Sequence, residues 1–405
     1  MQFKSGTWPS IIGIYLFGVC GASTVSKIIP LSEDIGRSFA LSAADFGWLI
    51  SFIAVPAAIF AIPSGVVVDR LGARRVLLLG ALLGMAANAL YFISPGLAFI
   101  QAARLLEGFA IVHIYTAGPA LLMATTDGGT RTRAMTFWST YAPVGTAAGL
   151  AIGGLFAQSE DWRNAFVLHG ALFAIAGALC FLQPKLPTAQ AGASATAGKR
   201  FNDLAMAFLS PKLLLLGLAF FLLVSMGLGA NVTFPTHLAQ VHAIPIGQSS
   251  NIVAGTTLAM ILGSLAVGLL LPRGIRPLGM FCVLAFACFV AGALCFYPGI
   301  SLSMRYATLL GWFIFTGAGM ATLLAMLPMM AEAGRQGSAA ALLNFAGALA
   351  TVLNPPLWLA ISASGEWTPF IGLMAAGWGL AAIFVWGSVL MLRRSSGSDV
   401  SDRPA

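Results

Sequence analysis

Two oppositely charged residues, Arg104 and Glu107, stand one helical turn apart inside an apolar run. Residues three apart share a helix face, so the two side chains can pair. A charge inside a run long enough to cross a bilayer is costly and therefore indicates function. Apolar surroundings oppose ionisation of the Glu107 carboxyl, whereas Arg104 favours it. We predict that this pair binds and releases a proton. A static pair that anchors neighbouring helices is the alternative.

Further polar and aromatic residues inside apolar runs are candidates for lining a substrate cavity: Lys27, Tyr115, Asn231, Arg305, Trp312 and Asn344. At about 100° per residue, Tyr115 returns to the helix face of Arg104. Lys27 and Arg305 lie near the ends of their runs, so anchoring at the membrane interface is the alternative to substrate contact. Asparagines need hydrogen-bond partners in lipid, which either a neighbouring helix or a ligand would supply.

No residue pattern in the chain indicates catalysis. The five cysteines fall inside apolar runs, without the close spacing of a metal site. The sequence has no nucleophile elbow, phosphate-binding loop or sizeable soluble segment. We therefore expect no catalytic residue, no metal and no cofactor, and we expect that the protein is not an enzyme.

The composition shows which elements must position these residues. Of 405 residues, 59% are hydrophobic and only 8% are charged, far from the values of soluble domains. A helix needs about 20 apolar residues to span a bilayer, and continuous runs of that kind exclude the alternating strands of a membrane β-barrel. We predict twelve spanning helices, at residues 9–30, 47–68, 76–93, 97–124, 135–157, 163–183, 213–236, 250–271, 277–297, 304–330, 337–361 and 367–392.

The charged residues indicate the orientation of the chain. Most of the 21 lysines and arginines fall in the two tails and in the loops after even-numbered spans, whereas the opposite loops are mainly acidic. By the positive-inside bias, the basic side is cytoplasmic. We predict a multi-pass protein of a bacterial-type inner membrane with both termini in the cytoplasm. The net charge of +8 is spread over these loops and not gathered in a patch, so we expect no nucleic-acid partner.

A proline-punctuated, basic stretch of small residues separates the sixth and seventh runs. Such a sequence cannot bury a core and indicates a linker. Gly108 and Gly317 belong to a faint internal repeat with a shift of 209 residues, which indicates that the two halves are related. We predict an N-terminal six-helix bundle over 1–184, a cytoplasmic linker over 185–212, a C-terminal six-helix bundle over 213–393 and a cytoplasmic tail over 394–405.

The loop between the second and third predicted spans reads Gly65-Val-Val-Val-Asp69-Arg70-Leu-Gly72-Ala-Arg74-Arg75. It resembles the G-x-x-x-D-R-x-G-R-R signature of the major facilitator superfamily. The resemblance implies an all-α membrane fold of twelve helices in two pseudo-symmetric six-helix bundles. It also implies a cytoplasmic gate at this loop, formed by Gly65, Asp69, Arg70, Gly72 and Arg74.

Two other segments are similar to elements of this superfamily. The stretch from Arg104 to Gly108 resembles the R-x-x-x-G element, which is linked with proton coupling in proton-driven members. Glycines Gly145, Gly149 and Gly153 form one face of the fifth span, as in the antiporter element of drug exporters. The Gly-Pro dipeptide of that element is missing here, and tight helix packing explains the glycines as well.

These features together predict secondary active transport by alternating access. We expect proton coupling and a small organic solute that is neutral or anionic, because the cations Lys27, Arg104 and Arg305 outnumber the single acid Glu107 inside the spans. The alternative is an efflux pump that exchanges drugs or metabolites for protons. The expected partners are the solute, protons and the lipid bilayer, and we expect a monomer.

Overall fold

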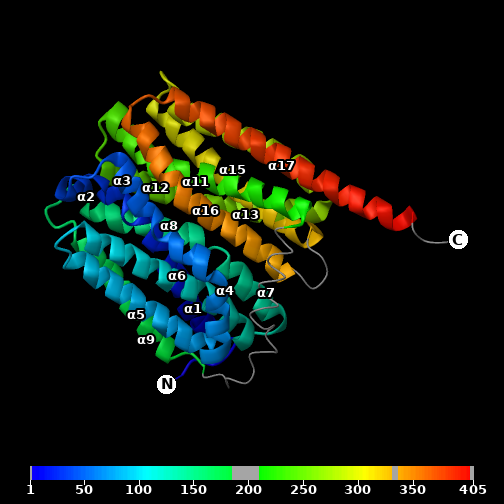
Figure 1. The fold of residues 1–405 in the computed structure, drawn as a ribbon, viewed down its shortest axis with the longest axis horizontal. Coiled ribbons are helices and arrows are strands. Elements are labelled where there is room, and N and C mark those ends of the chain that lie inside the picture. The colour runs from blue at the N-terminus through cyan, green and yellow to red at the C-terminus, as the bar shows by residue number, and fades with distance from the viewer. Residues whose placement is uncertain (1, 185–208, 331–335, 402–405) are drawn as a thin grey trace. The chain divides into compact units, whose positions relative to one another are not determined.

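The computed structural model describes residues 2–184, 209–330 and 336–401, and within these ranges all regular secondary structure is helical (Figure 1). Most of the predicted linker, and the end of the predicted tail, lie outside the described residues. Eleven helical stretches are long and apolar enough to cross a bilayer, and α8 is a shorter apolar helix. In order along the chain they match the twelve predicted spans. The prediction of an all-helical membrane protein is confirmed.

The first six spans are built from nine α-helices and a short 3-10 turn. The second span is broken at residues 52 and 53, and the fifth at 139 and 140. The elements are α1 (Trp8–Ser26), η1 (Ile29–Leu31), α2 (Ser32–Phe39), α3 (Ala43–Ser51), α4 (Ala54–Leu71), α5 (Ala73–Phe92), α6 (Leu97–Thr125), α7 (Gly128–Trp138), α8 (Tyr141–Phe156) and α9 (Asn164–Phe181).

The last six spans follow a similar plan. The eighth span is broken at residues 258 and 259, in the same relative place as the second. The elements are α11 (Pro211–His242), α12 (Ile246–Thr257), α13 (Met260–Leu270), η3 (Leu271–Arg273), α14 (Pro277–Phe296), α15 (Leu302–Met330), α16 (Gln336–Ala363) and α17 (Thr368–Ser401).

Equivalent helix crossings relate the two halves. Gly108 of α6 lies against the break of the second span, where a Cβ would collide with the carbonyl oxygen of Ile53. Gly317 of α15 lies against the break of the eighth span, where a Cβ would collide with the carbonyl oxygen of Met260. The pairs α5–α6, α4–α6 and α5–α9 recur as α14–α15, α13–α15 and α14–α17. Gly108 and Gly317 are therefore corresponding points of close helix approach in the two halves.

Close packing divides the chain into two compact units. The first contains α1 to α9 together with Asn231–Thr257 and Pro355–Ala360, and the second contains the start of α11, Leu258–Asn354 and the chain from Ile361 onward. Parts of both predicted halves thus meet inside the first unit. There, α8 packs on α12, and a Cβ on Gly247 would lie 2.7 Å from the carbonyl oxygen of Gly154.

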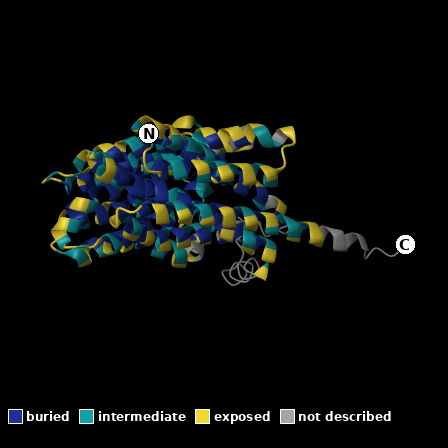
Figure 2. Ribbon diagram, turned by 90° about the horizontal axis from the view of Figure 1, so that it is seen from above, coloured by how far each residue is buried: buried dark blue, intermediate teal, exposed yellow. Residues whose placement is uncertain are grey.

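The outward faces of the helices carry large apolar side chains. Leu155, Val283 and Phe286 are 69%, 68% and 68% exposed, and buried residues gather where the helices of a unit meet (Figure 2). Isolated apolar residues occur on any protein surface, but Val283 and Phe286 belong to α14, which has the length and hydropathy of a membrane span. Lipid is the solvent that fits such faces.

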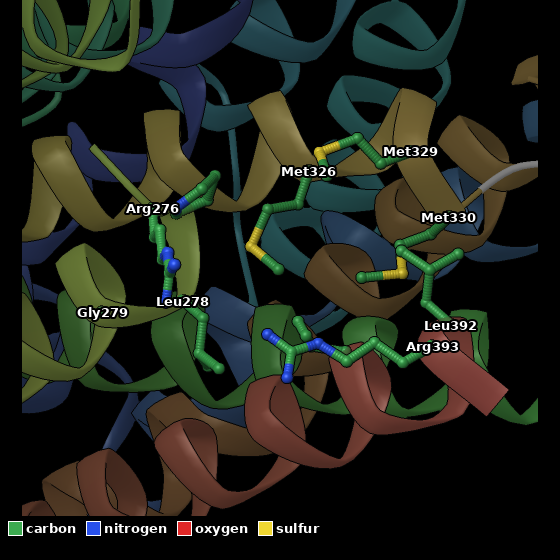
Figure 3. Close-up of a pocket in the computed structure, with 10 residues that line it drawn as sticks. Arg276, Leu278, Gly279, Met326, Met329, Met330, Leu392 and Arg393 are labelled. Atoms are coloured by element: carbon green, nitrogen blue, oxygen red, sulfur yellow. The ribbon is translucent and has the colours of Figure 1, made fainter. Parts of the chain in front are cut away.

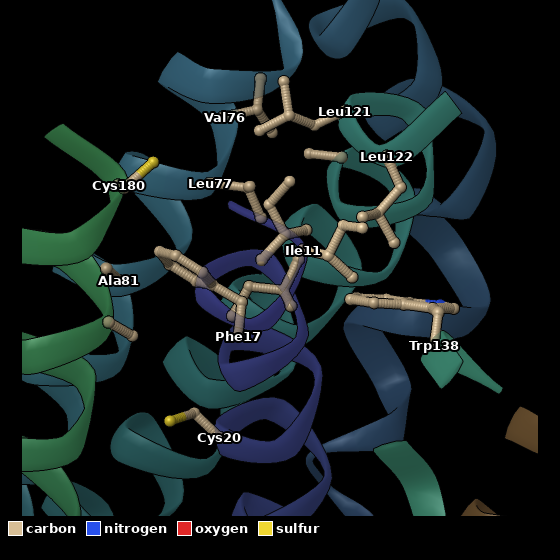
Figure 4. Packing of buried hydrophobic residues seen from close by; sticks show 14 of the residues in the cluster. Ile11, Phe17, Cys20, Val76, Leu77, Ala81, Leu121, Leu122, Trp138 and Cys180 are labelled. Atoms are coloured by element: carbon tan, nitrogen blue, oxygen red, sulfur yellow. The ribbon is translucent and has the colours of Figure 1, made fainter. Parts of the chain in front are cut away.

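An apolar cluster fills one end of the first unit. Ile11 and Phe17 of α1 pack with Leu77 of α5 and Leu121 of α6, and Trp138 at the end of α7 closes the cluster (Figure 4). Ile11, Phe17, Leu77 and Leu121 are each at most 1% exposed. This cluster lies at the predicted cytoplasmic end, and it separates that end from the polar residues described next.

The glycine face of α8 holds the end of α1 in place. A Cβ on Gly145 would collide with Ala22, one on Gly149 with Ser23, and one on Gly153 with the carbonyl oxygen of Lys27. Glycine permits this close approach because it lacks a Cβ. Tight packing therefore accounts for these glycines, and it fixes the backbone that carries Lys27.

Candidate functional site

The predicted charge pair on α6 is buried and ion-paired. The side chains of Arg104 and Glu107 are both 0% exposed, and Arg104 Nη1 lies 2.9 Å from Glu107 Oε2. Their spacing of three residues puts both on the face of α6 that points into the first unit. The hydroxyl of Tyr91 on α5 donates a hydrogen bond of 2.8 Å to the same carboxylate oxygen. The carboxylate is thus held by groups from two helices.

Lys27 supplies a second cation to the site. It caps the C-terminal end of α1, its side chain is 0% exposed, and its ammonium nitrogen lies 2.6 Å from Glu107 Oε1. The same nitrogen lies 5.2 Å from the ring centroid of Tyr91 and 5.0 Å from that of Phe166, which adds cation–π stabilisation. Lys27 points into the helix bundle, so it is not an interfacial anchor.

The polar contacts of Lys27 suit a charged ammonium group. Three acceptors surround its nitrogen: Glu107 Oε1 at 2.6 Å, Asn88 Oδ1 at 2.5 Å and His169 Nδ1 at 2.7 Å. A charged ammonium group has three N–H donors and no acceptor, which matches this set. When Lys27 donates to His169 Nδ1, the ring proton of His169 lies on Nε2, which is 2.7 Å from Ser23 Oγ.

Arg104 connects the ends of two other helices to α6. Its guanidinium donates to the carbonyl oxygens of Leu49 at 3.1 Å and Ile50 at 3.2 Å, in the last turn of α3, and to that of Thr24 at 2.8 Å, near the end of α1. The last carbonyls of a helix lack partners within the helix and carry partial negative charge, so a cation is favourable there. The break in the second span exposes the carbonyls that Arg104 binds.

The cluster holds two cations and one carboxylate. Lys27, Arg104 and Glu107 together carry a net charge of +1, and both oxygens of Glu107 are engaged and inaccessible to solvent. Solvent therefore does not reach this carboxylate in the structure. Protonation would then leave two buried cations without a counter-ion, which is costly in a low-dielectric interior.

Three residues of the cluster were not predicted from the sequence. Asn88 and Tyr91 are three apart on α5, so both face the cluster, and His169 lies on α9. Polar residues inside an apolar run are the signal that could have found them. The sequence alone does not show that α1, α5, α6 and α9 bring these polar groups to one place.

The other predicted cavity residues have separate surroundings. Tyr115 is half-buried, with its ring centroid 4.8 Å from that of Tyr141. Asn231 is buried and accepts a hydrogen bond of 3.2 Å from Thr257. Trp312 is fully buried, whereas Asn344 is exposed.

Arg305 acts as a helix cap. It is 2% exposed, and its guanidinium donates to the carbonyl oxygens of Cys295 at 2.5 Å and Tyr297 at 2.9 Å, at the end of α14. Such a position stabilises the C-terminal end of a helix. These contacts favour the anchoring alternative that the sequence left open for Arg305.

The predicted gate loop contains one glycine, Gly72, in a backbone conformation with positive φ. Gly72 joins α4 to α5 with φ +83°, and a Cβ there would meet nothing within 4 Å, so the backbone conformation and not space requires glycine. Arg74 donates to the carbonyl oxygens of Cys180 at 2.9 Å and Phe181 at 2.8 Å at the end of α9. Arg70 is exposed. Gly65 and Asp69 lie in α4, and their surroundings are outside the described part of the structure.

A family model places the chain among known proteins. The model of the Major Facilitator Superfamily matches residues 11–355, most of the chain. The chain belongs to the major facilitator superfamily. Members of this superfamily are transporters, and the protein is therefore a multi-pass membrane transporter.

Curated relatives within the superfamily match part of the chain. The multidrug resistance protein Stp of Mycobacterium tuberculosis is 27% identical over 159 residues, or 39% of this chain and 29% of Stp. The tetracenomycin C resistance and export protein of Streptomyces glaucescens is 28% identical over 163 residues, or 40% of this chain and 30% of that protein. The matched segment thus spans less than a third of either relative.

Solved transporters share the superfamily fold over nearly the full length. A bacterial homologue of the human lysosomal transporter Spinster, in an inward-facing and unoccupied conformation, has a TM-score of 0.70 at 17% identity over 98% of both chains. The nucleoside transporter NupG has a TM-score of 0.75 at 14% identity over 94% of this chain and 99% of its own. At these identities the likeness concerns the fold alone.

Proposed function

We propose that the protein is a proton-coupled secondary transporter of a small neutral or anionic organic solute, with Glu107 as the proton-binding residue. The observation that carries the proposal is the buried cluster of Lys27, Arg104 and Glu107, in which two cations share one carboxylate. A net positive interior repels cationic solutes.

The cluster provides a reason for coupling between a proton and an anion. When Glu107 is ionised, it neutralises one of the two buried cations. When it takes up a proton, Lys27 and Arg104 lose their only anionic partner, and an uncompensated buried charge costs about 3–5 kcal/mol. A carboxylate of the solute would restore the missing charge. Binding of the proton and binding of the anion would then each favour the other. Such positive coupling between the two ligands is the requirement for symport.

Alternating access is proposed from the superfamily fold and from the way the helix ends meet. In the first unit, α8 packs on α12 through Gly154 and Gly247, at the end predicted to face the periplasm. We propose that this contact closes that side in one state, and that the loop with Asp69, Arg70 and Arg74 closes the cytoplasmic side in the other. The proposed orientation has both termini in the cytoplasm of a bacterial-type inner membrane, and the proposed state is a monomer.

A second candidate function is efflux of drugs or metabolites in exchange for protons. It is favoured by the relatives named for multidrug resistance and for tetracenomycin C export, which match about two fifths of this chain. The missing Gly-Pro dipeptide in α8 argues against it, because Gly149 is followed by Leu150. The Arg104–Glu107 pair would serve as the proton site in either function.

Transport into vesicles distinguishes the two functions. Purified protein is reconstituted into lipid vesicles, a pH gradient is imposed, and a panel of labelled organic acids, sugars and cationic dyes is tested for accumulation. We expect an organic acid or neutral solute to move in the same direction as protons. Movement of a dye or drug against the proton flow would establish exchange and would overturn the symport proposal.

A further inference from the structure

A cavity of about 480 Å³ opens among α14, α15 and α17 in the second unit (Figure 3). Methionines Met326, Met329 and Met330 of α15 form one wall, and Leu278 and Leu392 contribute apolar surface from the other two helices. Unbranched methionine side chains adapt to partners of variable shape. The volume lies within the range of small-molecule sites.

Two arginines border this apolar cavity. Arg276 directly precedes α14, Arg393 lies on α17, and both are exposed. Figure 3 shows the Arg393 guanidinium extending across the cavity toward the start of α14. Among the described residues that line the cavity there is no acid. The site therefore offers two positive charges beside an apolar surface, and the ligand that complements it carries an anionic group on an apolar body.

The equivalent place in the first unit is closed. Arg74 stands two residues after Gly72, whose φ is +83°, and Arg276 stands two residues after Gly274, whose φ is +86°. Arg74 donates hydrogen bonds to the last carbonyls of α9 and so connects the start of α5 to the end of α9. Arg276 instead remains exposed beside the cavity.

The apolar residues at corresponding positions of the two places are both buried. Leu121 of α6 is 1% exposed within the packed cluster of Figure 4. Its counterpart at the shift of 209 residues is Met330, which is also buried, lines the cavity and accepts a hydrogen bond of 3.4 Å from Ser388 Oγ through its sulfur. The difference between the two places lies in the arginines, because Arg74 binds helix carbonyls whereas Arg276 is exposed beside the cavity.

We propose that this cavity, bordered by Arg276 and Arg393, binds an anionic phospholipid. The phosphate group would lie between the two guanidinium groups, and the start of an acyl chain would lie against the methionines. The location fits this occupant, because the cavity lies where the apolar helices end and the arginines begin, at the level of lipid headgroups on the predicted cytoplasmic side. Basic pockets between membrane helices on that side are suited to such headgroups.

The test compares lipids and matched variants of the purified full-length chain. Binding of phosphatidylglycerol and of phosphatidylcholine with identical acyl chains is measured by native mass spectrometry from an uncharged detergent. The variant Arg276→Gln/Arg393→Gln removes both charges of the cavity. Arg273→Gln/Arg394→Gln removes the same charge from neighbouring exposed arginines that do not line it. Melting temperatures without lipid show that both variants are folded.

We expect the wild type to prefer phosphatidylglycerol. The cavity variant should bind it about 25-fold more weakly, since each arginine near the headgroup contributes about fivefold, and the control should change by less than about threefold. An equal loss of phosphatidylglycerol binding in the cavity variant and the control variant would show general charge attraction. It would contradict a binding site at this cavity. If glycerol phosphate competes at the same concentration as the lipid, the cavity binds soluble anions. That result would contradict the proposal that its ligand is a phospholipid. If the cavity variant does not fold, Arg393→Gln alone should still weaken binding about fivefold, and no loss would count against the proposal.

Discussion

At the scale of single residues, the site depends on the match between donors and acceptors around Lys27. Its three acceptors account for all three N–H groups of an ammonium ion. Removing one member of such a buried set leaves the others without partners, and that cost exceeds the net value of the bond itself. The individual residues of the cluster should therefore show strong mutual dependence.

A double-mutant cycle tests this dependence. Glu107→Gln leaves Lys27 and Arg104 without a counter-ion, and we expect a loss of about 3–5 kcal/mol in the free energy of unfolding. Lys27→Met in the same chain removes the excess cation and should recover most of that loss. The measurement is thermal unfolding of detergent-purified protein, with both single variants and the double variant compared. Simple addition of the two single losses would show that the residues are not coupled.

His169 offers a second residue-scale prediction. His169→Phe keeps an aromatic ring on α9 but removes the acceptor of one Lys27 N–H and the donor to Ser23. We expect destabilisation of about 1–3 kcal/mol from the unsatisfied buried groups. His113→Phe is the control, because His113 is half-buried and its ring forms a hydrogen bond with a carbonyl of its own helix, that of Phe109. Equal melting temperatures for the two variants would contradict the role given to His169.

At the scale of helices, glycine contacts position the cluster. Gly153→Ala would push α8 against the carbonyl oxygen of Lys27, and we expect a cost of about 1–3 kcal/mol, typical of overpacking. Gly268→Ala in α13 is the matched control, because its Cβ would meet nothing within 4 Å and alanine favours a helix. Melting temperatures of the two variants give the comparison. A control that is as unstable as Gly153→Ala would contradict the positioning role of the Gly153 contact.

Most of the helices could be predicted from the sequence, but not the details of their ends. Apolar runs determine where the spans lie, because a helix needs about 20 apolar residues to cross the bilayer core. The breaks at 52–53 and 258–259 could not be predicted, since the residues there are as apolar as their neighbours. The Arg104–Glu107 pair followed from its spacing within one helix. The partners of Lys27 did not, because Asn88 and His169 are brought to it by tertiary packing alone.

At the scale of the whole molecule, the account requires a gate on the predicted cytoplasmic side. Asp69→Asn removes the acid of the signature loop, and we expect slower or abolished transport with normal expression. Asp127→Asn, which changes an acid at the start of α7 outside that loop, is the control. Initial rates of solute uptake into vesicles give the comparison. Wild-type rates for Asp69→Asn would remove the gate assignment.

The central claim is that Glu107 carries the coupled proton, and transport by Glu107→Gln tests it most directly. The variant is reconstituted, below its melting temperature, into vesicles that contain a solute accumulated by the wild type. Two rates are then measured: accumulation driven by a pH gradient, and exchange of labelled for unlabelled solute without a gradient. The account predicts that driven accumulation is lost while exchange continues. Accumulation that persists at the wild-type level would contradict it.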